Sequence, residues 1–397
     1  MTIGVDEFTE RARAFLDASA APAPDRAARW GEGSDDVGLF DNSADRADSP
    51  AVLAARSWQA TKFAAGYGWI TGPRDLGGSA LPIEHDVAFS RLEDRYAIPD
   101  PTILSVGLHM VRPTVARWAQ PGVRESVGRG LASADVVGCQ LFSEPEAGSD
   151  LAAIRTTARR DGDGWVVDGQ KIWTSHGHLS DVGLLLARSD PAAPRHRNLT
   201  MFLVDMSSPG VDARPIRQAT GAEGYSEVFF DGVRVPDSHR LGPVGEGWQV
   251  AVSTLMNERL SIGSGRSNRT VDLALLMELV RRHGDGSALT RDLAARAYVA
   301  QRLSERFAAS CAQEVLDGGS PGPRFSLGKV LLVESLNRTA ELVDHVLSGR
   351  AVADTTEWGT YAWHLVGLEI PAYSVGGGSD EIQRTIVAER VLGLPKA

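Results

Sequence analysis

Three stretches of different hydrophobic periodicity follow one another along the chain. Up to about residue 135, apolar side chains recur at helical spacing, which predicts helices over Glu7–Ala18, Ala51–Tyr67, His85–Glu93 and Leu104–Trp118. From residue 136 the pattern changes to short strands, as in Gly164–Gln170, Val182–Ala187, Leu199–Val204 and Val228–Val235. After Glu246 helical spacing returns, over Trp248–Ile262, Thr270–Arg282, Arg291–Leu316, Leu327–Leu347 and Ile382–Leu392. The pattern predicts an α+β protein with a helical domain at 1–135, a β domain at 136–245 and a helical domain at 246–397.

Charge and composition narrow the classes of function. The 397 residues include 41 Lys and Arg against 51 Asp and Glu, a net charge of −10, and the first fifty residues alone carry −6. A protein this acidic is not expected to bind nucleic acid through a broad basic face. Its two cysteines are far apart, and the sequence shows neither a leader pattern nor a membrane-length apolar run. We therefore expect a cytoplasmic protein without disulfides.

Several common catalytic motifs are missing from the sequence. It contains no GxGxxG after a strand, no GxxxxGK[ST] and no GxSxG, which argues against Rossmann, P-loop and serine-hydrolase sites. His176 and His178 are two residues apart, but no carboxylate or cysteine follows at ligand spacing. We expect these to be loop histidines, and no metal site is predicted.

Three other motifs point to a site. They are Leu141–Asp150 (LFSEPEAGSD), Gly169–Ser175 (GQKIWTS) and Ser374–Arg384 (SVGGGSDEIQR). The third is a glycine-rich turn that leads into a helix. A helix N-terminus offers unpaired N–H groups and the positive end of the helix dipole, which suit a carbonyl or anionic oxygen.

In this order and spacing, the motifs resemble the acyl-CoA dehydrogenase family of flavoproteins, over nearly the whole chain. The resemblance implies an N-terminal helical domain, a middle β-barrel or sandwich and a C-terminal four-helix bundle, with FAD as cofactor. Trp173 would pack on the flavin ring and Ser175 would bond near its N5 atom. The full set of implied FAD contacts is Phe142, Ser143, Gly148, Ser149, Trp173, Ser175, Ser379 and Glu381. Implied substrate contacts are Ser149, Ser105 and Arg259.

The position of the catalytic base distinguishes this chain within the family. Family members take the α proton with a carboxylate, most often at the position of Gly377 here, whose backbone N–H would still donate to the thioester carbonyl. Isovaleryl-CoA and long-chain members instead use a glutamate on the first helix after the β domain, which is Glu258 here. Ala251, Leu255, Glu258 and Ile262 follow a helical apolar spacing, so burial should raise the pKa of the glutamate. The alternative is a structural ion pair with an arginine.

Two departures from the family pattern concern the neighbouring subunit. The Arg-x-x-Phe-Gly element that would reach the FAD of the partner is absent from Arg281–Ser287, and Gly-Gly-x-Gly is reduced to Ser348–Arg350. A homotetramer or dimer is expected, or a heteromer with a related subunit.

Other partners follow from the same resemblance. They are an acyl-CoA and an electron-transfer flavoprotein or similar acceptor. The small Ser105 suggests a branched, long or ring-bearing acyl group. Alternative functions are a flavin monooxygenase or nitroalkane-oxidase-like enzyme, or a non-catalytic subunit.

Overall fold

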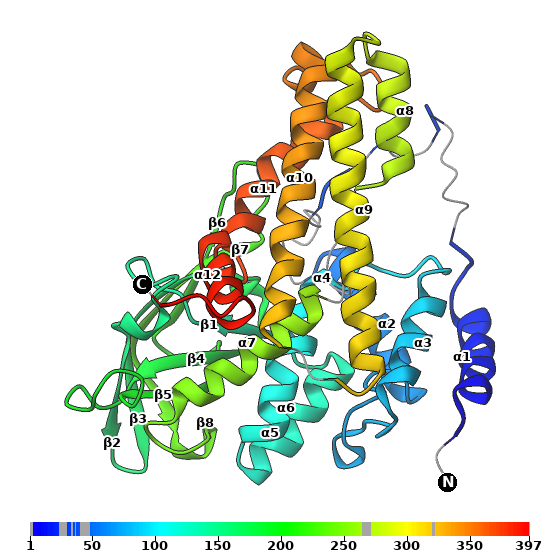
Figure 1. Ribbon diagram of the computed structural model, residues 1–397. Helices are drawn as coiled ribbons and strands as arrows, with labels where there is room; N and C mark the ends of the chain where they lie inside the picture. Colours follow the sequence, from blue (N-terminus) through cyan, green and yellow to red (C-terminus); the bar gives the residue numbers. More distant parts are fainter. Residues whose placement is uncertain are drawn as a thin grey trace. The chain divides into compact units, whose positions relative to one another are not determined.

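The chain forms two compact units (Figure 1). The computed structural model describes residues 3–23, 30–32, 35, 37–39, 48–263, 271–319 and 322–396, without the side chains of residues 258–263. Unit 1 comprises Met1–Pro24 and Asn42–Glu258, and unit 2 comprises Asp25–Asp41 and Arg259–Ala397. Within the described residues, no helix is long and apolar enough to cross a membrane.

The helices of unit 1 begin at capping signals visible in the sequence. Ser49 caps α2 by accepting from the Val52 N–H, and Pro50 occupies the first helical position. A cluster that includes Phe8, Trp58 and Phe89 joins α1, α2 and α3. The helices are α1 Val5–Ser19, α2 Pro50–Ala64, α3 Ile83–Glu93, α4 Thr102–Val106, α5 Arg112–Trp118, α6 Pro121–Ser133 and α7 Gly247–Gly263, of which α7 belongs to unit 1 up to Glu258.

The helix predicted over Leu104–Trp118 contains a π turn. The segment α4, the π turn Gly107–Val111 (η2) and α5 follow without a break. A Cβ on Gly107 would stand 3.1 Å from the backbone N of Gly138, so the glycine permits close packing against the first strand. Since a π turn widens the helix by one residue, it changes which side chains face that strand.

Eight strands form the sheet of unit 1 in the order β6-β7-β3-β2-β4-β5-β8, and β1 pairs in parallel with β4. The strands are β1 Gly138–Leu141, β2 Thr157–Asp161, β3 Gly164–Ser175, β4 Val182–Arg188, β5 Leu199–Asp205, β6 Val211–Ile216, β7 Tyr225–Pro236 and β8 Arg240–Leu241. The four runs predicted as strands lie within β3, β4, β5 and β7. The sequence did not indicate β1, β2, β6 and β8.

Strand β4 is buried on both faces, which explains its unbroken apolar sequence. Leu184 and Leu186 join a core cluster with Val115 of α5 and Val250 of α7. The alternate residue Leu185 belongs to a second cluster formed by the strands. The sheet is therefore packed against helices on one face and against its own curled strands on the other.

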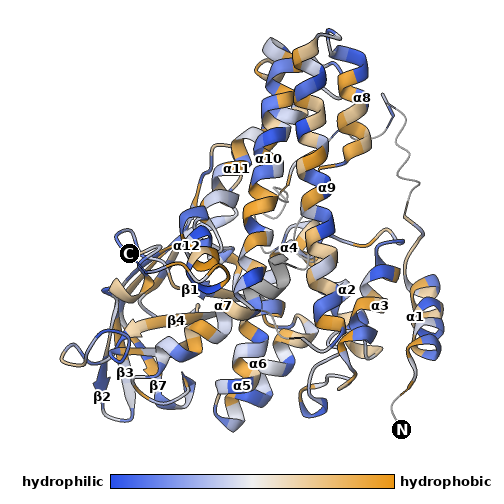
Figure 2. Ribbon diagram, viewed as in Figure 1, coloured by the Kyte–Doolittle hydropathy of each residue, from blue (hydrophilic) through white to orange (hydrophobic). Residues whose placement is uncertain are grey.

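Unit 2 is built from long amphipathic helices, whose alternating apolar and polar positions appear in orange and blue in Figure 2. They are α8 Leu273–His283, α9 Ala288–Leu316, α10 Ser326–Leu347, α11 His364–Val375 and α12 Asp380–Arg390. The buried Leu276, Ala297, Leu336 and Trp363 belong to one core cluster. Single 3₁₀ turns of the two units are Arg74–Leu76, Leu151–Ala153, Gly177–Leu179, Asp237–His239, Pro323–Phe325, Ser348–Ala351 and Tyr361–Trp363.

A short N-terminal segment belongs to unit 2, although the helices that flank it in sequence belong to unit 1. Trp30 packs edge-on against Trp358, with ring centroids 5.0 Å apart. The Gly359 N–H donates to an Asp35 carboxylate oxygen at 2.7 Å. The Leu39 N–H donates to Glu369 Oε2 at 2.6 Å, and Leu39 is part of the unit 2 core. We call the described residues 30–32, 35 and 37–39 the N-terminal strap.

Candidate functional site

The loop after β1 is organised around a buried carboxylate. Glu144 is 8% exposed, and its side chain accepts from the Arg155 N–H at 2.6 Å and from the Thr156 N–H at 2.9 Å. Lys171 Nζ donates to the same carboxylate at 2.8 Å. The backbone of Glu144 also exchanges two hydrogen bonds with Ala147, which closes a tight turn. The Glu144 side chain therefore stabilises the conformation of the loop through its buried hydrogen bonds.

Lys171 joins this loop to strand β3. Its side chain is fully buried, and Nζ also donates to the Phe142 carbonyl at 2.9 Å. Next to it, the Ile172 N–H donates to the Ser143 carbonyl at 2.9 Å. Two successive carbonyls of the loop are therefore bound by two successive residues of the strand, and the loop–strand geometry is fixed.

Burial disfavours the charged form of both residues, so on its own it shifts their pKa values in opposite directions. Burial lowers the pKa of Lys171 to about 8, because the attraction of Glu144 offsets only part of the lost hydration. Burial also tends to raise the pKa of Glu144. The Lys171 charge and the hydrogen bonds from Lys171, Thr156 and Arg155 outweigh that tendency and hold it below its ordinary value.

Trp173 stands at an irregular point of β3. The pairing with β7 shifts register between Lys171 and Thr174. Trp173 has a φ of +60°, which residues other than glycine rarely adopt. Trp173 is 58% exposed, and its ring lies edge-on to Tyr225 with the ring centroids 6.2 Å apart. A strained backbone that exposes a large apolar ring is suited to form one wall of a binding site for a flat aromatic ligand. The residues present are therefore compatible with a flavin.

The remaining predicted contacts in unit 1 differ in exposure. The Phe142 side chain is buried in a core cluster, so its backbone is the part available to a ligand. Gly148 and Ser149 are exposed, and nothing lies within 4 Å of a Cβ placed on Gly148. Ser175 is half-buried at the end of β3. The loop thus leaves open backbone where a phosphate-bearing ligand could approach.

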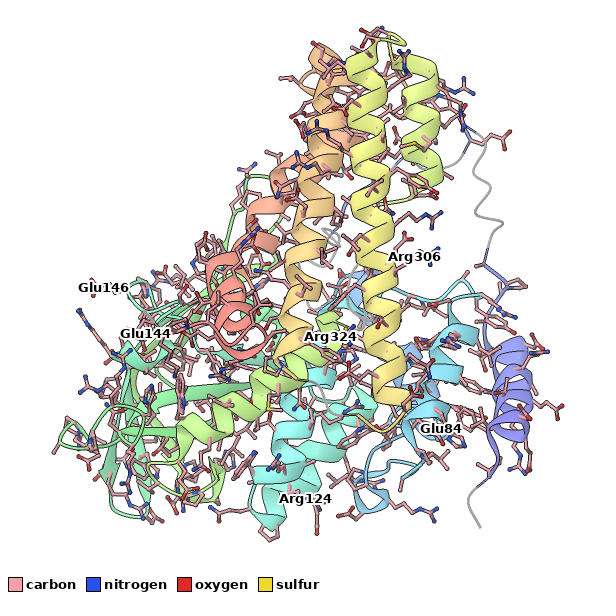
Figure 3. All side chains as sticks on the ribbon, viewed as in Figure 1. Glu84, Arg124, Glu144, Glu146, Arg306 and Arg324 are labelled. Atoms are coloured by element: carbon pink, nitrogen blue, oxygen red, sulfur yellow. The ribbon has the colours of Figure 1, made fainter. Side chains whose placement is uncertain are left out.

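Charged residues mark the outer side of the same loop. Glu146 is exposed and pairs with Arg155 at 2.6 Å, and Asp150 pairs with Arg195. Figure 3 labels both glutamates of the loop, with Glu144 against the sheet and Glu146 toward the periphery. Exposed pairs of this kind contribute little stability.

The glycine-rich motif of unit 2 forms a left-handed turn before α12. Gly377 and Gly378 have φ values of +66° and +84°. Ser379 caps α12 by accepting from the Ile382 N–H at 3.4 Å. Glu381 lies in the first turn of α12, and its own backbone N–H and the Ser379 hydroxyl lower its pKa. The structure thus brings Gly377, Ser379 and Glu381 together at one helix N-terminus.

The other predicted residues lie on helices. Glu258 and Arg259 are in α7, and their side chains are outside the described residues. Ser105 is a half-buried residue of α4, and its hydroxyl is 3.4 Å from His109 Nδ1. Their proposed roles therefore stay predictions.

Three charged residues that organise these motifs were not assigned a role from the sequence: Glu144, Lys171 and Lys329. The rarity of lysine could have drawn attention to Lys171 and Lys329, because only four of the 41 basic residues are lysines. Lys329 also shares a helical spacing with the apolar Val333 and Leu336, and both are buried in the structure. A lysine at such a position predicts a buried charge that needs partners.

Comparisons with known proteins identify the family and the fold of this chain. Family models for the acyl-CoA dehydrogenase middle domain and C-terminal domain match residues 139–233 and 245–392. The acyl-CoA dehydrogenase IpdE1 of Mycobacterium tuberculosis is 35% identical over 346 residues, covering 86% of this chain and 88% of that protein.

Two solved structures support the expected α+β fold. The Tcur3481-Tcur3483 steroid ACAD has a TM-score of 0.73 at 23% identity and covers 99% of this chain and 98% of that one. The ChsE4-ChsE5 complex from Mycobacterium tuberculosis has a TM-score of 0.72 at 23% identity over the full length of both chains.

Proposed function

Because this chain belongs to the acyl-CoA dehydrogenase family, we propose that it catalyses the α,β-dehydrogenation of an acyl-CoA thioester with FAD as cofactor. The observation that carries the proposal is the buried Glu144–Lys171 pair, which fixes the loop and the strand that display Trp173. Bound FAD would supply the acceptor for the hydride that leaves the β carbon. The chain itself must bind the thioester, orient it and remove the α proton.

We assign cofactor contacts to motif residues in each unit separately. In unit 1 we assign the ring contacts to Ser143, Trp173 and Ser175, and backbone contacts to Phe142. The open loop at Gly148 and Ser149 would receive the pyrophosphate and the CoA. Ser379 and Glu381 are assigned as further cofactor contacts. Support comes from the exposed ring of Trp173 and from the open backbone at Gly148.

The α proton would be taken by Glu258. Gly377 has no side chain, so the turn before α12 supplies no carboxylate, and Glu258 is the single acidic residue in the sequence of α7. The Gly377 N–H would donate to the thioester carbonyl, which acidifies the α proton. The neighbouring Arg259 and Ser105 are assigned to the substrate.

The decisive experiment measures flavin reduction by acyl-CoA without oxygen. Glu258→Gln should retain FAD and bind acyl-CoA but reduce flavin about 10²–10⁴-fold more slowly, which is the contribution typical of general-base catalysis. Glu258→Asp should retain partial activity. The matched control is Glu125→Gln, which neutralises an exposed glutamate on α6. Full activity of Glu258→Gln would disprove the assignment.

The same preparation separates the other candidate chemistries. Rapid reoxidation of the reduced flavin by oxygen, or turnover without CoA, would indicate a monooxygenase or oxidase. Colourless protein that gains FAD only on co-expression with a related chain would indicate a non-catalytic subunit. Because the similar ChsE4-ChsE5 structure is a complex of two chains, we propose an oligomer, and light scattering on the purified protein tests it.

The substrate and the electron acceptor need separate assays. We propose a branched, long or ring-bearing acyl group, because Ser105 is small. A panel of acyl-CoAs scored by flavin bleaching tests this, and a preference for short linear chains would contradict it. We propose an electron-transfer flavoprotein as acceptor, to be tested by reduction of that protein in the presence of substrate.

A further inference from the structure

Lys329 is a buried cation at the glycine-rich turn of unit 2. Its side chain is 7% exposed. Nζ donates to the Ser374 carbonyl at 2.9 Å and to the Gly378 carbonyl at 2.6 Å, and it lies 3.2 Å from Asp380 Oδ1. The ammonium therefore makes two hydrogen bonds to carbonyls of the turn and an ion pair with Asp380. The lysine therefore bridges α10 to both ends of the turn.

The two carbonyls enclose the segment that carries Gly377. Ser374 lies in the last turn of α11, where a cation also interacts favourably with the helix dipole. Gly378 directly precedes the N-cap of α12. Asp380, in the first turn of α12, balances the lysine charge. Lys329 thus fixes the end of one helix relative to the beginning of the next.

Gln383 forms a second contact on the same side. It is 2% exposed, and its Nε2 donates to the Gly377 carbonyl at 2.6 Å. A Cβ on Gly378 would lie 2.7 Å from that nitrogen, so a side chain there would displace Gln383. The carbonyls of Gly377 and Gly378 are therefore both held from inside the unit.

The direction of the carbonyls sets the direction of the amides. The described peptide bonds are all trans, and in a trans peptide the C=O and the following N–H point in opposite directions. The N–H groups of Gly378 and Ser379 thus point away from Lys329 and Gln383. Among the described residues, neither amide donates to a backbone carbonyl. The turn presents a small set of oriented donors.

We propose that Lys329 is a positioning residue that, with Gln383, aims the amides of Gly378 and Ser379 at the thioester oxygen. This inference rests on the proposed function. Negative charge develops on that oxygen when the α proton leaves, and donors already held in place stabilise it without reorganisation. Lys329 contacts the Ser374 and Gly378 carbonyls and Asp380, so we assign it a role through the turn rather than a contact with the substrate.

The first measurement is hydrogen exchange of the full-length protein, which needs no substrate. Lys329→Met removes the three N–H donors with little change in side-chain length. Exchange should increase in the peptide covering residues 374–383 and stay unchanged in α1, α2 and α3. Gln383→Met should have a smaller effect in the same peptide, and it leaves no buried charge unpaired. Lys62→Met, which removes a half-buried lysine paired with Glu93 in unit 1, is the matched control.

The second measurement is single-turnover flavin reduction at saturating acyl-CoA. Displacing a catalytic donor by about 1 Å costs about 10²-fold in rate, so the Lys329→Met rate constant should fall by about that factor. KM should change less than about threefold, because the donors act mainly on the developing charge. Lys329→Arg, which keeps a buried cation with several donors, should recover at least about tenfold of the loss.

Three outcomes would overturn the proposal. One is exchange at residues 374–383 that matches the wild type in both variants. Another is flavin reduction within about twofold of wild type despite faster local exchange. The third is a loss of rate that is fully accounted for by a loss of bound FAD or by faster hydrogen exchange throughout the protein. Lys329 would then be a purely structural support. If no acyl-CoA reduces the flavin of the wild type, the proposed function is wrong. The proposal that the amides are oriented toward a thioester oxygen is then wrong as well. The exchange data would then still show whether Lys329 holds the turn.

Discussion

Replacing Lys171 by methionine removes the cation from the pair that joins the Phe142–Asp150 loop to β3. The variant keeps a side chain of similar length, so the fully buried space stays filled. It leaves Glu144 with its two backbone donors and no charged partner. The Phe142 carbonyl loses a hydrogen bond of 2.9 Å as well.

The expected loss of stability is about 3–5 kcal/mol, which is typical when one partner of a buried ion pair is removed. The pair as a whole contributes less. A pKa of about 8 for Lys171 against 10.5 in water means that the folded surroundings, even with Glu144 present, disfavour its charged form by roughly 3 kcal/mol. Most of the loss in Lys171→Met should therefore come from the unpaired Glu144 carboxylate. Adding Glu144→Gln should restore about half of it or more.

Urea unfolding followed by circular dichroism measures both effects. The single variant, the double variant Lys171→Met/Glu144→Gln and the control Lys62→Met are compared at pH 7. The control should lose less than about 2 kcal/mol, because its pair is only half-buried. Retained FAD, measured by absorbance after gel filtration, should fall in the single variant and recover partly in the double variant.

Two results would refute this reasoning. A single variant as stable as the wild type would mean that the Glu144 carboxylate is hydrated in solution. A double variant less stable than the single one would mean that the pair contributes net stability beyond compensation of its own burial. Either result would require a different account of how the loop is fixed.

Three further predictions concern pH, the strained tryptophan and the strap. Between about pH 8 and 10.5 the unfolded chain binds the Lys171 proton more tightly than the folded chain. The stability of wild type relative to Lys171→Met should therefore rise with pH by up to about 3 kcal/mol, and a flat difference in urea midpoints would contradict this. Trp173→Gly should change the free energy of unfolding by less than about 1 kcal/mol, because relief of the left-handed backbone offsets the entropy of glycine. Its retained FAD should fall at least by half, and unchanged retention would exclude Trp173 as a ring contact. Trp30→Ala should cost about 2 kcal/mol and speed hydrogen exchange in α11 but not in α1, and equal exchange in both would argue against a docked strap.

Long amphipathic segments were predicted well, because their periodicity directly reflects burial. The helices α9 and α10 and the strands β4 and β5 lie close to the predicted ranges. Helix α6 was missed because Gly122, Gly128 and Gly130 weaken its helical pattern. Gly130 packs so closely on Val136 that a Cβ would lie 2.6 Å from its side chain, so tertiary packing overrides propensity there. Pro371 obscured α11 in the same way.

The candidate site was only partly predictable. The motifs that contain Trp173 and Gly377 were recognisable because glycine, serine and aromatic residues occur in a family-specific order. The interactions that hold them were not, because Lys329 lies 45 residues from Ser374 and Lys171 lies 27 residues from Glu144. Sequence spacing does not encode contacts across such distances. The left-handed φ of Trp173 likewise arises from a register shift that local pattern does not reveal.

The N-terminal strap has a consequence for the order of events during synthesis. Leu39 is made early, but its hydrogen-bond partner Glu369 follows 330 residues later. At about 5–20 residues per second, the ribosome needs roughly 16–66 s to produce that partner. The sheet of unit 1 can form meanwhile, whereas unit 2 cannot complete its core until nearly the whole chain exists. The first fifty residues carry a net charge of −6, which favours hydration of this segment and opposes its association with other nascent chains until unit 2 is complete.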